Sequence, residues 1–544
     1  MTVASFLSCG ERLVQLLEAY GIDTVFGIPG NHTVQLYRGL ASSSIRHISP
    51  RHEQGAAFMA DGYARASGTP AACFLISGPG LGNAITPMMQ ALADSVPMLV
   101  VTAVAARSQL GMGEGRLHEL PDQRALASQC TRFSHTLMDP ADLPKVLARA
   151  FAVFDSQRPG PVHIELPLDV ITMEAPPLAA WPRTLPAAAD RGGLAQLAQR
   201  LAAAERPCLI AGGGAADAAD AVRVVAEACE APVLTTVNGK GILPPAHPLQ
   251  VGGSPSLGCV REFLAQSDAV LAVGTEFAET DYDMLFLGEI ARPGWLARID
   301  VDAAQLCRNL RADLPLCGDA RSSLEALVEL IPAPGAASSG EGAQRVARLR
   351  AAIREEEHVR EEFATFFSTI RDTLPGVCLV GDSTLPTYHA VWQYEAPGPR
   401  RYFHSATGAG TLGYALPAAI GARRALPPEV SVVALIGDGA LQFTLPELAS
   451  AAQEGLPVIV LLWNNNGYAE IRNGMQASGI EPIGVDVAAP DFVTAAQALG
   501  CVARRVAGPD ALAPALREAW QEARPTLLEL PEDAFLTKPS GLWY

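Results

Sequence analysis

Short apolar runs alternate with amphipathic helical stretches along most of the chain. In the first 175 residues the apolar runs are "TVFGIPG", "AACFLISGPG", "PMLVVTAV" and "GPVHIELP", and a shorter one lies around "IRHIS". Near-continuous apolar strands separated by helices are typical of a parallel sheet whose two faces are both covered. The pattern therefore predicts an α/β domain at the start of the chain.

The same alternation occurs twice more. "PCLIAGGG", "APVLTTV", "AVLAVG" and "ARIDVD" form a second group. "GVCLVGDS", "SVVALIGDG", "PVIVLLWNNN" and "PTLLELP" form a third, after a charged helix expected over 345–366. Soft stretches rich in Pro, Ala and Gly, "EAPPLAAWPRTLPAAADRGG" and residues 331–344, separate the groups. We predict three doubly wound parallel-sheet domains, at 1–175, 190–332 and 345–544.

Composition argues against several classes of function and location. The chain has 544 residues and a net charge of −17 without acidic blocks, which argues against nucleic acid as a partner. No apolar run is long enough to span a membrane, and the N-terminus lacks the features of a secretion signal. Ten cysteines are scattered without a C-x-x-C pair, which is typical of reduced thiols. We expect a cytoplasmic protein.

Polar side chains follow two apolar strands of the third group. "VVALIGDG" ends at Gly437, Asp438 and Gly439, and a helix is expected over 445–454. The next strand ends at Asn464–Asn466. Strands that only close a core do not need a carboxylate and amides at their ends, so we expect a bound ligand there.

The spacing of these residues suits a magnesium diphosphate. Asp438 and Asn465 are 465 − 438 = 27 residues apart, which one strand–helix–strand excursion brings side by side. A carboxylate, an amide oxygen and a backbone carbonyl, with phosphate oxygens and water, complete an octahedron around Mg²⁺. The alternative is that Asp438 caps a helix and the asparagines form a turn.

This segment resembles the diphosphate motif of thiamine-diphosphate-dependent enzymes. The resemblance implies that Asp438, Asn465 and the backbone oxygen of Gly467 hold Mg²⁺. It also implies that further residues in and near these motifs contact thiamine diphosphate: Gly30, Gly410, Gly437, Gly439, Ala440 and Tyr468.

Two other segments carry the same resemblance. "RHEQGAAFMADGYARASG" is similar to the family's activating element, in which the Glu, here Glu53, hydrogen-bonds the aminopyrimidine ring of the cofactor. A helix-dipole role for Glu53 is the alternative. "GAGTLGYALPAAIGA" places Leu412 at the position of the bulky residue that bends the cofactor, although a structural helix entry also explains its glycines.

The resemblance covers essentially the whole chain, with "NGKGILPPAHPL" similar to the middle domain. The domains would be a pyrimidine-binding, a middle and a diphosphate-binding domain. The resemblance further implies a homodimer or homotetramer, because one active site takes Glu53 and the diphosphate motif from different subunits.

Substrate choice depends on loop residues of this family. Asn31 lies at a substrate-facing position, where an amide can donate to a carboxylate, although a left-handed turn residue is the alternative. Gln123 resembles a Gln near the cofactor of acetolactate synthases, although a solvated loop also explains it. The pocket histidine of benzoylformate decarboxylase would fall near Ile76 and is missing, as are the paired histidines of pyruvate decarboxylases, so we expect no proton relay through histidine.

Glu470 is the most informative of these positions. It follows Asn465 by five residues, at a substrate-facing position that is usually apolar in the family. A buried carboxylate needs a partner, and a cationic substrate tail would supply one; a guanidinium would do so bidentately. The alternatives are that Glu470 turns outward or pairs with Arg472.

Our leading hypothesis is a decarboxylase of a 2-oxo acid with a basic tail. "GRLHELPDQ" and "GTEFAETDYD" resemble the 5-guanidino-2-oxopentanoate decarboxylases, which would make 4-guanidinobutanal and CO₂. The rival is an acetolactate-synthase-like carboligase that joins two pyruvates. Such enzymes commonly bind FAD, which we do not expect here because "VGGSPSLGCVREFL" departs from the flavin-contacting pattern. A non-catalytic paralogue is disfavoured because Glu53, Asp438 and Asn465 are all present.

Overall fold

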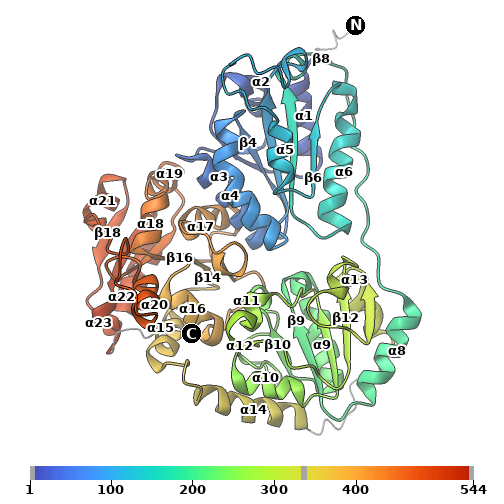
Figure 1. The fold of residues 1–544 in the computed structure, drawn as a ribbon, viewed down its shortest axis with the longest axis vertical. Helices are drawn as coiled ribbons and strands as arrows, with labels where there is room; N and C mark the ends of the chain where they lie inside the picture. The colour runs from blue at the N-terminus through green and yellow to red at the C-terminus, as the bar shows by residue number, and fades with distance from the viewer. Residues whose placement is uncertain (1–6, 332–339, 538–544) are drawn as a thin grey trace. The chain divides into compact units, whose positions relative to one another are not determined.

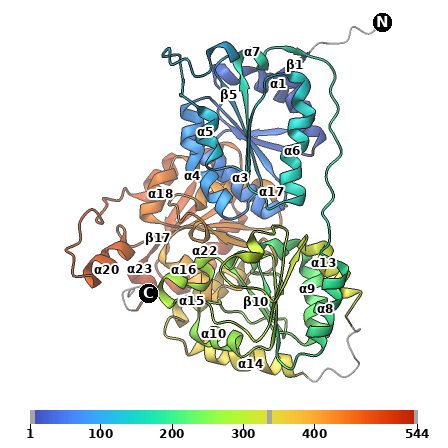
Figure 2. The ribbon, with the colours of Figure 1, turned by 45° about the vertical axis from the view of Figure 1, so that its right-hand side comes forward.

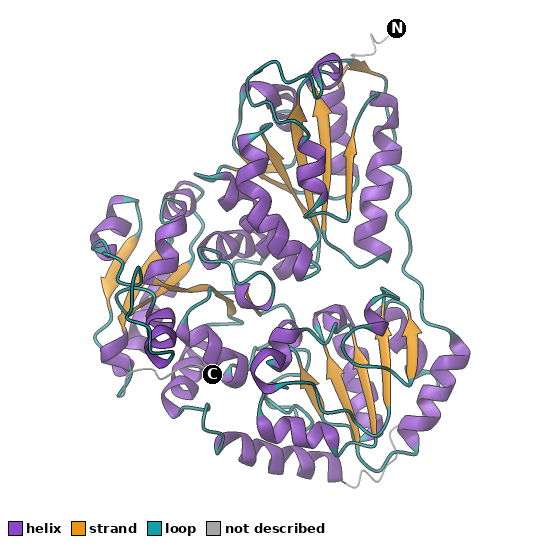
Figure 3. Ribbon diagram, in the orientation of Figure 1, coloured by secondary structure: helices purple, strands orange, loops and turns teal. Residues whose placement is uncertain are grey.

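The computed structural model describes residues 7–331 and 340–537. The soft stretch expected over 331–344 lies largely outside the described residues. The described chain forms two compact units: one contains the residues up to Leu185 together with Gly408–Leu426 and Thr444–Leu456, and the other contains the remainder. Three parallel sheets with flanking helices confirm the expected α/β class (Figure 3).

The N-terminal sheet has six parallel strands in the order β3-β2-β4-β5-β7-β6. They are β2 (Thr24–Gly27), β3 (Arg46–Ile48), β4 (Ala71–Leu75), β5 (Met98–Val104), β6 (Phe133–Thr136) and β7 (Pro161–Pro167). The helices are α1 (Cys9–Ala19), η1 (Asn31–Thr33), α2 (Val34–Leu40), α3 (Glu53–Ser67), α4 (Pro79–Ala93), η2 (Arg107–Gln109), α5 (Gln123–Ser128), η3 (Pro140–Asp142), α6 (Leu143–Ser156) and α7 (Leu168–Ile171). A short antiparallel pair, β1 (Leu7–Ser8) and β8 (Glu174–Ala175), joins the two ends of this domain.

The middle sheet has five parallel strands in the order β10-β9-β11-β12-β13. They are β9 (Pro207–Ala211), β10 (Val233–Thr235), β11 (Ala269–Val273), β12 (Leu296–Asp300) and β13 (Leu314–Cys317). The helices are α8 (Arg191–Ala202), η4 (Gly213–Ala218), α9 (Ala219–Cys229), η5 (Val237–Gly239), α10 (Gly258–Ala265), α11 (Glu279–Tyr282), α12 (Met284–Leu287), η6 (Gln305–Cys307) and α13 (Ala320–Val328); Figure 2 shows α8, α9 and α13 along one side of this sheet.

The C-terminal sheet has six parallel strands in the order β15-β14-β16-β17-β19-β18. They are β14 (Cys378–Gly381), β15 (Tyr402–His404), β16 (Val432–Gly437), β17 (Ile459–Asn464), β18 (Val502–Arg505) and β19 (Thr526–Pro531). The helices are α14 (Glu341–Arg354), α15 (Glu361–Thr373), α16 (Leu385–Gln393), η7 (Ser405–Thr407), α17 (Ala415–Ala425), α18 (Asp438–Thr444), α19 (Glu447–Gln453), α20 (Ala469–Ala477), α21 (Phe492–Ala498), α22 (Pro509–Gln521) and α23 (Glu532–Phe535). Counted from its own first strand, this sheet repeats the order of the N-terminal sheet.

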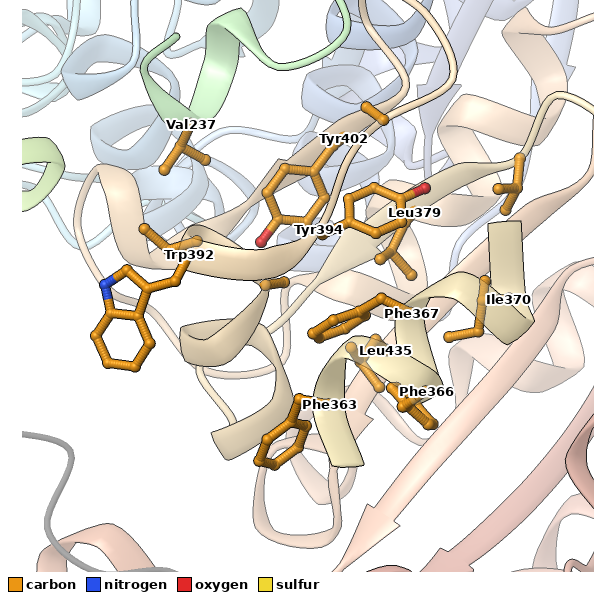
Figure 4. Packing of buried hydrophobic residues seen from close by; sticks show 14 of the residues in the cluster. Val237, Phe363, Phe366, Phe367, Ile370, Leu379, Trp392, Tyr394, Tyr402 and Leu435 are labelled. Carbon is orange, nitrogen blue, oxygen red and sulfur yellow. The ribbon is translucent and has the colours of Figure 1, made fainter. Parts of the chain in front are cut away.

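An aromatic cluster supports the C-terminal sheet. Figure 4 shows Phe363, Phe366 and Phe367 of α15 beside Leu379 of β14 and Leu435 of β16. At the end of β17, the Trp463 ring lies 5.9 Å from that of Phe366. Because Trp463 is 1% exposed and immediately precedes the strand-end asparagines, the core fixes the position from which they project.

Helices α3 and α17 pack unusually closely, and they lie side by side in Figures 1 and 2. A Cβ atom added at Gly62 would lie 1.9 Å from the carbonyl oxygen of Ala418. One added at Gly421 would lie 1.8 Å from the carbonyl oxygen of Met59. Glycine at both positions is what allows the two backbones to meet.

Two helical expectations need correction. The charged helix expected over 345–366 is two helices, α14 and α15, with a break after Arg354. The helix expected over 445–454 is preceded by another, α18, which begins at Asp438 itself. In the described part of the chain, every helix is too short or too polar to cross a lipid bilayer.

Candidate active site

Asp438 is held by the loop that follows the neighbouring strand. Its side chain is buried at the end of β16, and its Oδ2 accepts from the backbone N–H of Gly467 at 2.8 Å. The N–H of Asn465 approaches Oδ1 at 3.5 Å. Burial raises the pKa of the Asp438 carboxyl, while these backbone donors lower it. A divalent cation at this carboxylate would favour the ionised form.

Asn465 is oriented by an acidic residue that the sequence did not single out. Its Nδ2 donates to Oε2 of Glu532 at 3.2 Å, and Trp463 Nε1 donates to the same oxygen at 2.8 Å. A carboxylate only accepts, so the amide nitrogen must face Glu532 and the amide oxygen is left for another partner. Asp438 and Asn465 thus offer two hard oxygen atoms, which fit Mg²⁺.

The residues predicted to hold magnesium include only one charged side chain, that of Asp438. The described residues contain no cluster of three or more His, Cys, Asp or Glu that could hold a metal. The predicted set has one carboxylate, one amide and the backbone carbonyl of Gly467. The metal therefore stays a prediction.

Glu470 lies in the first turn of α20 with an unsatisfied carboxylate oxygen. Its Oε1 is shielded from solvent and has no hydrogen-bond partner among the described residues. Burial, followed by the charge of Glu532, raises the pKa of Glu470 to about 7. Arg472 donates instead to Asp486, at 2.5 Å, and to the Asn466 carbonyl. The pairing with Arg472 considered from the sequence is therefore not formed.

Tyr388 of α16 is a second neighbour of Glu470 that the sequence did not indicate. Burial, and then the charge of Glu470, raise the pKa of the Tyr388 hydroxyl to about 12. The hydroxyl thus remains protonated and can donate a hydrogen bond. Glu470, Glu532 and Tyr388 come from three different helices, so no spacing rule could have grouped them.

In the other unit, three of the predicted residues follow the carboxyl ends of the adjacent strands β3 and β2. Glu53 begins α3 after β3, and its Oε2 accepts from Asn83 Nδ2 of α4 at 2.9 Å. Asn31 begins η1 after β2, a helical position rather than a left-handed turn. Gly30 lies against Ile76, where an added Cβ would be 2.5 Å from Ile76 Cδ1.

Gln123 is buried, and its side chain is fully engaged. Its Oε1 accepts from the N–H of Gly78 at 2.8 Å, and its Nε2 donates to the Ala103 carbonyl at 2.9 Å and to Glu165 Oε2 at 3.1 Å. The side chain is 4% exposed, so Gln123 is not part of a solvated loop. These bonds connect the start of α4 to the ends of β5 and β7.

Two histidines meet at the same edge of this sheet, which was not expected from the sequence. His32 of η1 and His118, in the loop after η2, have ring centroids 5.3 Å apart at an interplanar angle of 71°. His32 Nδ1 lies 2.7 Å from Ser77 Oγ. Our expectation of no histidine relay considered only the positions used by related enzymes. His32 and His118 are far apart in sequence.

The glycine-rich loop 408–414 is held at both ends by buried polar groups. At one end the Ala409 N–H donates to Gln90 Oε1 at 3.0 Å. At the other end the Tyr414 hydroxyl donates to Asp61 Oδ1 at 2.5 Å. Arg65 and Asp94 link the two ends, since Arg65 contacts both acids and Asp94 accepts from Gln90. Gly410 has φ +66° with open space around it, and Leu412 is half-buried.

Comparison with known protein families matches each of the three domains. The N-terminal domain matches the thiamine pyrophosphate enzyme N-terminal TPP binding domain over residues 7–126. Residues 194–327 match the central domain, and residues 380–530 match the C-terminal TPP binding domain. The chain belongs to the thiamine pyrophosphate enzyme family. The N-terminal and C-terminal domains, which carry the strand ends described above, are therefore thiamine-diphosphate-binding domains, as expected from the sequence.

Sequence similarity to individual proteins supports the same family assignment. The chain is 45% identical over 532 residues to a protein described as probable 2-ketoarginine decarboxylase AruI, from Pseudomonas aeruginosa, covering 96% of this chain and 94% of that protein. It is 32% identical to the acetolactate synthase large subunit of Corynebacterium glutamicum (96% and 87% covered). It is 30% identical to a probable acetolactate synthase large subunit of Methanocaldococcus jannaschii (98% and 93% covered).

Proposed function

We propose that this enzyme decarboxylates 5-guanidino-2-oxopentanoate, the 2-oxo acid of arginine, to 4-guanidinobutanal and CO₂. The observation that carries the proposal is Glu470, whose shielded carboxylate oxygen has no hydrogen-bond partner among the described residues. Its neighbour Glu532 accepts from Asn465, one of the residues predicted to bind the magnesium diphosphate. A guanidinium matches that need, because it brings a permanent positive charge and paired N–H donors. The similarity to a protein described as a 2-ketoarginine decarboxylase supports the same substrate.

Thiamine diphosphate, when bound, supplies the electron sink for loss of CO₂. The chain's own residues bind and orient the cofactor and the substrate. Asp438, Asn465 and the backbone oxygen of Gly467 would hold Mg²⁺, and Leu412 would support the rings of the cofactor. Glu53, which accepts a hydrogen bond from Asn83, would hold a proton at the aminopyrimidine ring. Asn31 donates to the substrate carboxylate.

We further propose that the enzyme is a homodimer or homotetramer with active sites at subunit interfaces. The two catalytic surfaces, the Glu53 side and the Asp438 side, lie in separate compact units of the chain. Sedimentation of the enzyme with and without cofactor tests this proposal. A monomer that is fully active would contradict it.

The second candidate is a carboligase that joins two pyruvates, favoured by the identity to acetolactate synthases. CO₂ release and product identity, measured side by side with 5-guanidino-2-oxopentanoate, a branched-chain 2-oxo acid and pyruvate, separate the two. Fastest turnover of the guanidino acid with release of the aldehyde supports our proposal. Acetolactate from pyruvate as the main product would overturn it. We propose no bound FAD, and a flavin absorption band in the purified protein would contradict that.

A further inference from the structure

The turn that presents Glu53 is held by a buried acid from a distant part of the sequence. Glu447 begins α19 and is 1% exposed. Its two carboxylate oxygens accept from the backbone N–H of Arg51 at 3.0 Å and 3.1 Å, and Oε1 also accepts from the N–H of His52 at 3.1 Å. Arg51 and His52 directly precede Glu53, so the backbone is fixed immediately before the predicted catalytic acid.

The surroundings of the Glu447 carboxylate fix its position. Ser450, in the same helix, donates from Oγ to Oε2 of Glu447 at 2.7 Å. A Cβ atom added at Gly55, in the first turn of α3, would lie 2.3 Å from Oε1, so glycine at this position leaves room for the acid. The carboxylate accepts each of these hydrogen bonds, which suits the ionised form of the acid.

Helix capping alone does not explain this acid. Other helices of the chain are capped by a residue of their own sequence, as α13 is by Asp319, which accepts from the Ser322 N–H at 2.8 Å. Helix α3 has such a cap too, since His52 Nδ1 accepts from the Gln54 N–H at 3.2 Å. Burial raises the pKa of Glu447, so keeping its charge at this place costs free energy. A second acid, held at that cost on a helix that is already capped, points to a role beyond capping.

We propose that Glu447 is a positioning residue for Glu53. By holding the N–H groups of Arg51 and His52, it sets the direction in which the first turn of α3 starts, and with it the position of Glu53. Glu53 has to reach a ring nitrogen of the aminopyrimidine within hydrogen-bond distance, and a displacement of about 1 Å at a reacting group can cost about 100-fold in rate. The inference rests on the role proposed above for Glu53 and adds the residue that keeps Glu53 in place.

Two measurements on Glu447→Gln test the proposal. The first follows amide hydrogen exchange of the full chain without cofactor by mass spectrometry. Loss of the carboxylate should speed exchange at Arg51 and His52 about tenfold and leave exchange in β4 unchanged. The second loads the enzyme with magnesium and thiamine diphosphate and measures how fast the thiazolium C2 proton of the bound cofactor exchanges with deuterium. This exchange needs no substrate, and it depends on the acid at the aminopyrimidine.

Glu447→Gln should slow the C2 exchange about 30-fold and leave the Kd of thiamine diphosphate within about threefold of the wild-type value, whereas a general loss of structure would weaken cofactor binding as well. Ser450→Ala removes one donor from the same carboxylate and keeps the charge of Glu447, so it should slow C2 exchange about threefold. The control is Asp319→Asn, which weakens a helix cap of the middle domain and should leave C2 exchange unchanged.

Glu53→Gln is the reference variant. If it slows C2 exchange while Glu447→Gln and Ser450→Ala both keep the wild-type rate, the inference is overturned and the role of Glu53 stands. An equal loss of cofactor affinity and of C2 exchange in Glu447→Gln, or unchanged amide exchange at Arg51 and His52, would also overturn the inference. If Glu53→Gln itself keeps the wild-type rate, the proposed role of Glu53 fails, and the inference fails with it.

Discussion

Replacing Glu470 with Gln should remove selection for a cationic substrate. The carboxylate has one shielded oxygen that finds no partner within residues 7–331 and 340–537, so a guanidinium that binds it gains a charge-assisted hydrogen bond. Loss of such a bond costs about 1–3 kcal/mol, which corresponds to about 5- to 150-fold in kcat/KM. We therefore expect the kcat/KM ratio of 5-guanidino-2-oxopentanoate to 2-oxohexanoate to fall by that factor.

The pH dependence follows from the raised pKa. The pKa of Glu470 rises from an ordinary 4.5 to about 7, so the carboxyl of the free enzyme becomes protonated as pH falls through 7. Selection for the cationic substrate should weaken below pH 7, and turnover of the apolar substrate should not follow this titration. Ionisation also costs stability: the folded protein is most stable with Glu470 protonated, and this advantage is lost as pH rises from 4.5 through 7.

The size of that stability cost can be bounded. A shift of this size corresponds to about 3 kcal/mol, which we reduce to about 1.5–2 kcal/mol because the side chain is partly exposed. Glu470→Gln should therefore raise the unfolding temperature at pH 8 and change it little at pH 4.5. A gain in stability at the expense of selectivity is typical of functional positions.

The matched control is Glu481→Gln, which removes a charge from an exposed position in the same segment. Steady-state kinetics with both substrates from pH 5.5 to 8.5, together with thermal unfolding, provide the measurements. If Glu470→Gln keeps the wild-type substrate ratio, or if the wild type turns over both substrates equally, the charge matching is refuted.

Three further predictions concern the cofactor. Asp438→Ala should abolish magnesium-dependent thiamine diphosphate uptake in calorimetry, and retained uptake would contradict the assigned ligand. Glu53→Gln should keep cofactor binding and lower CO₂ release by about 10²–10⁴-fold, the scale of an acid–base group; near-normal turnover would remove Glu53 from the mechanism. Gln90→Leu should weaken thiamine diphosphate binding about tenfold and speed hydrogen exchange at Ala409. The reason is that the loop loses the 3.0 Å hydrogen bond from the Ala409 N–H to Gln90 Oε1. The control Gln157→Leu, at an exposed position, should change neither cofactor affinity nor hydrogen exchange at Ala409. Equal behaviour of the two variants would show that the Ala409–Gln90 hydrogen bond is not needed for cofactor binding.

The apolar runs predicted the central strands of all three sheets, since strands buried on both faces are apolar throughout. Six strands that were not predicted, β1, β6, β8, β13, β15 and β18, all lie at sheet edges. Edge strands are paired on one side only, so they need less apolar sequence; β18 reads "VARR". The break between α14 and α15 lies in a run of charged residues that gives no stop signal.

The contact of Asp438 with the residues that follow β17 could be predicted, because a parallel sheet brings consecutive strand ends together. The contacts between side chains of elements far apart in the sequence could not be predicted. Glu532 reaches Asn465 from the end of β19, and His118 reaches His32 from a loop whose path depends on Gly78. Acidic residues at a strand end were a usable signal for Glu532, since "LPED" follows an apolar strand as "GDG" does. No local signal could have paired the two histidines.

The crossing of α3 and α17 leaves no space for even one methyl group at Gly62 or Gly421. Such close backbone contact opposes sliding and rotation of α3, so we expect Glu53 in its first turn to keep the same position before and after a ligand binds. The loss of conformational entropy needed to position the Glu53 side chain then occurs once, when the chain folds, rather than at each turnover. Efforts to widen the substrate range should therefore vary the loops and leave this crossing intact.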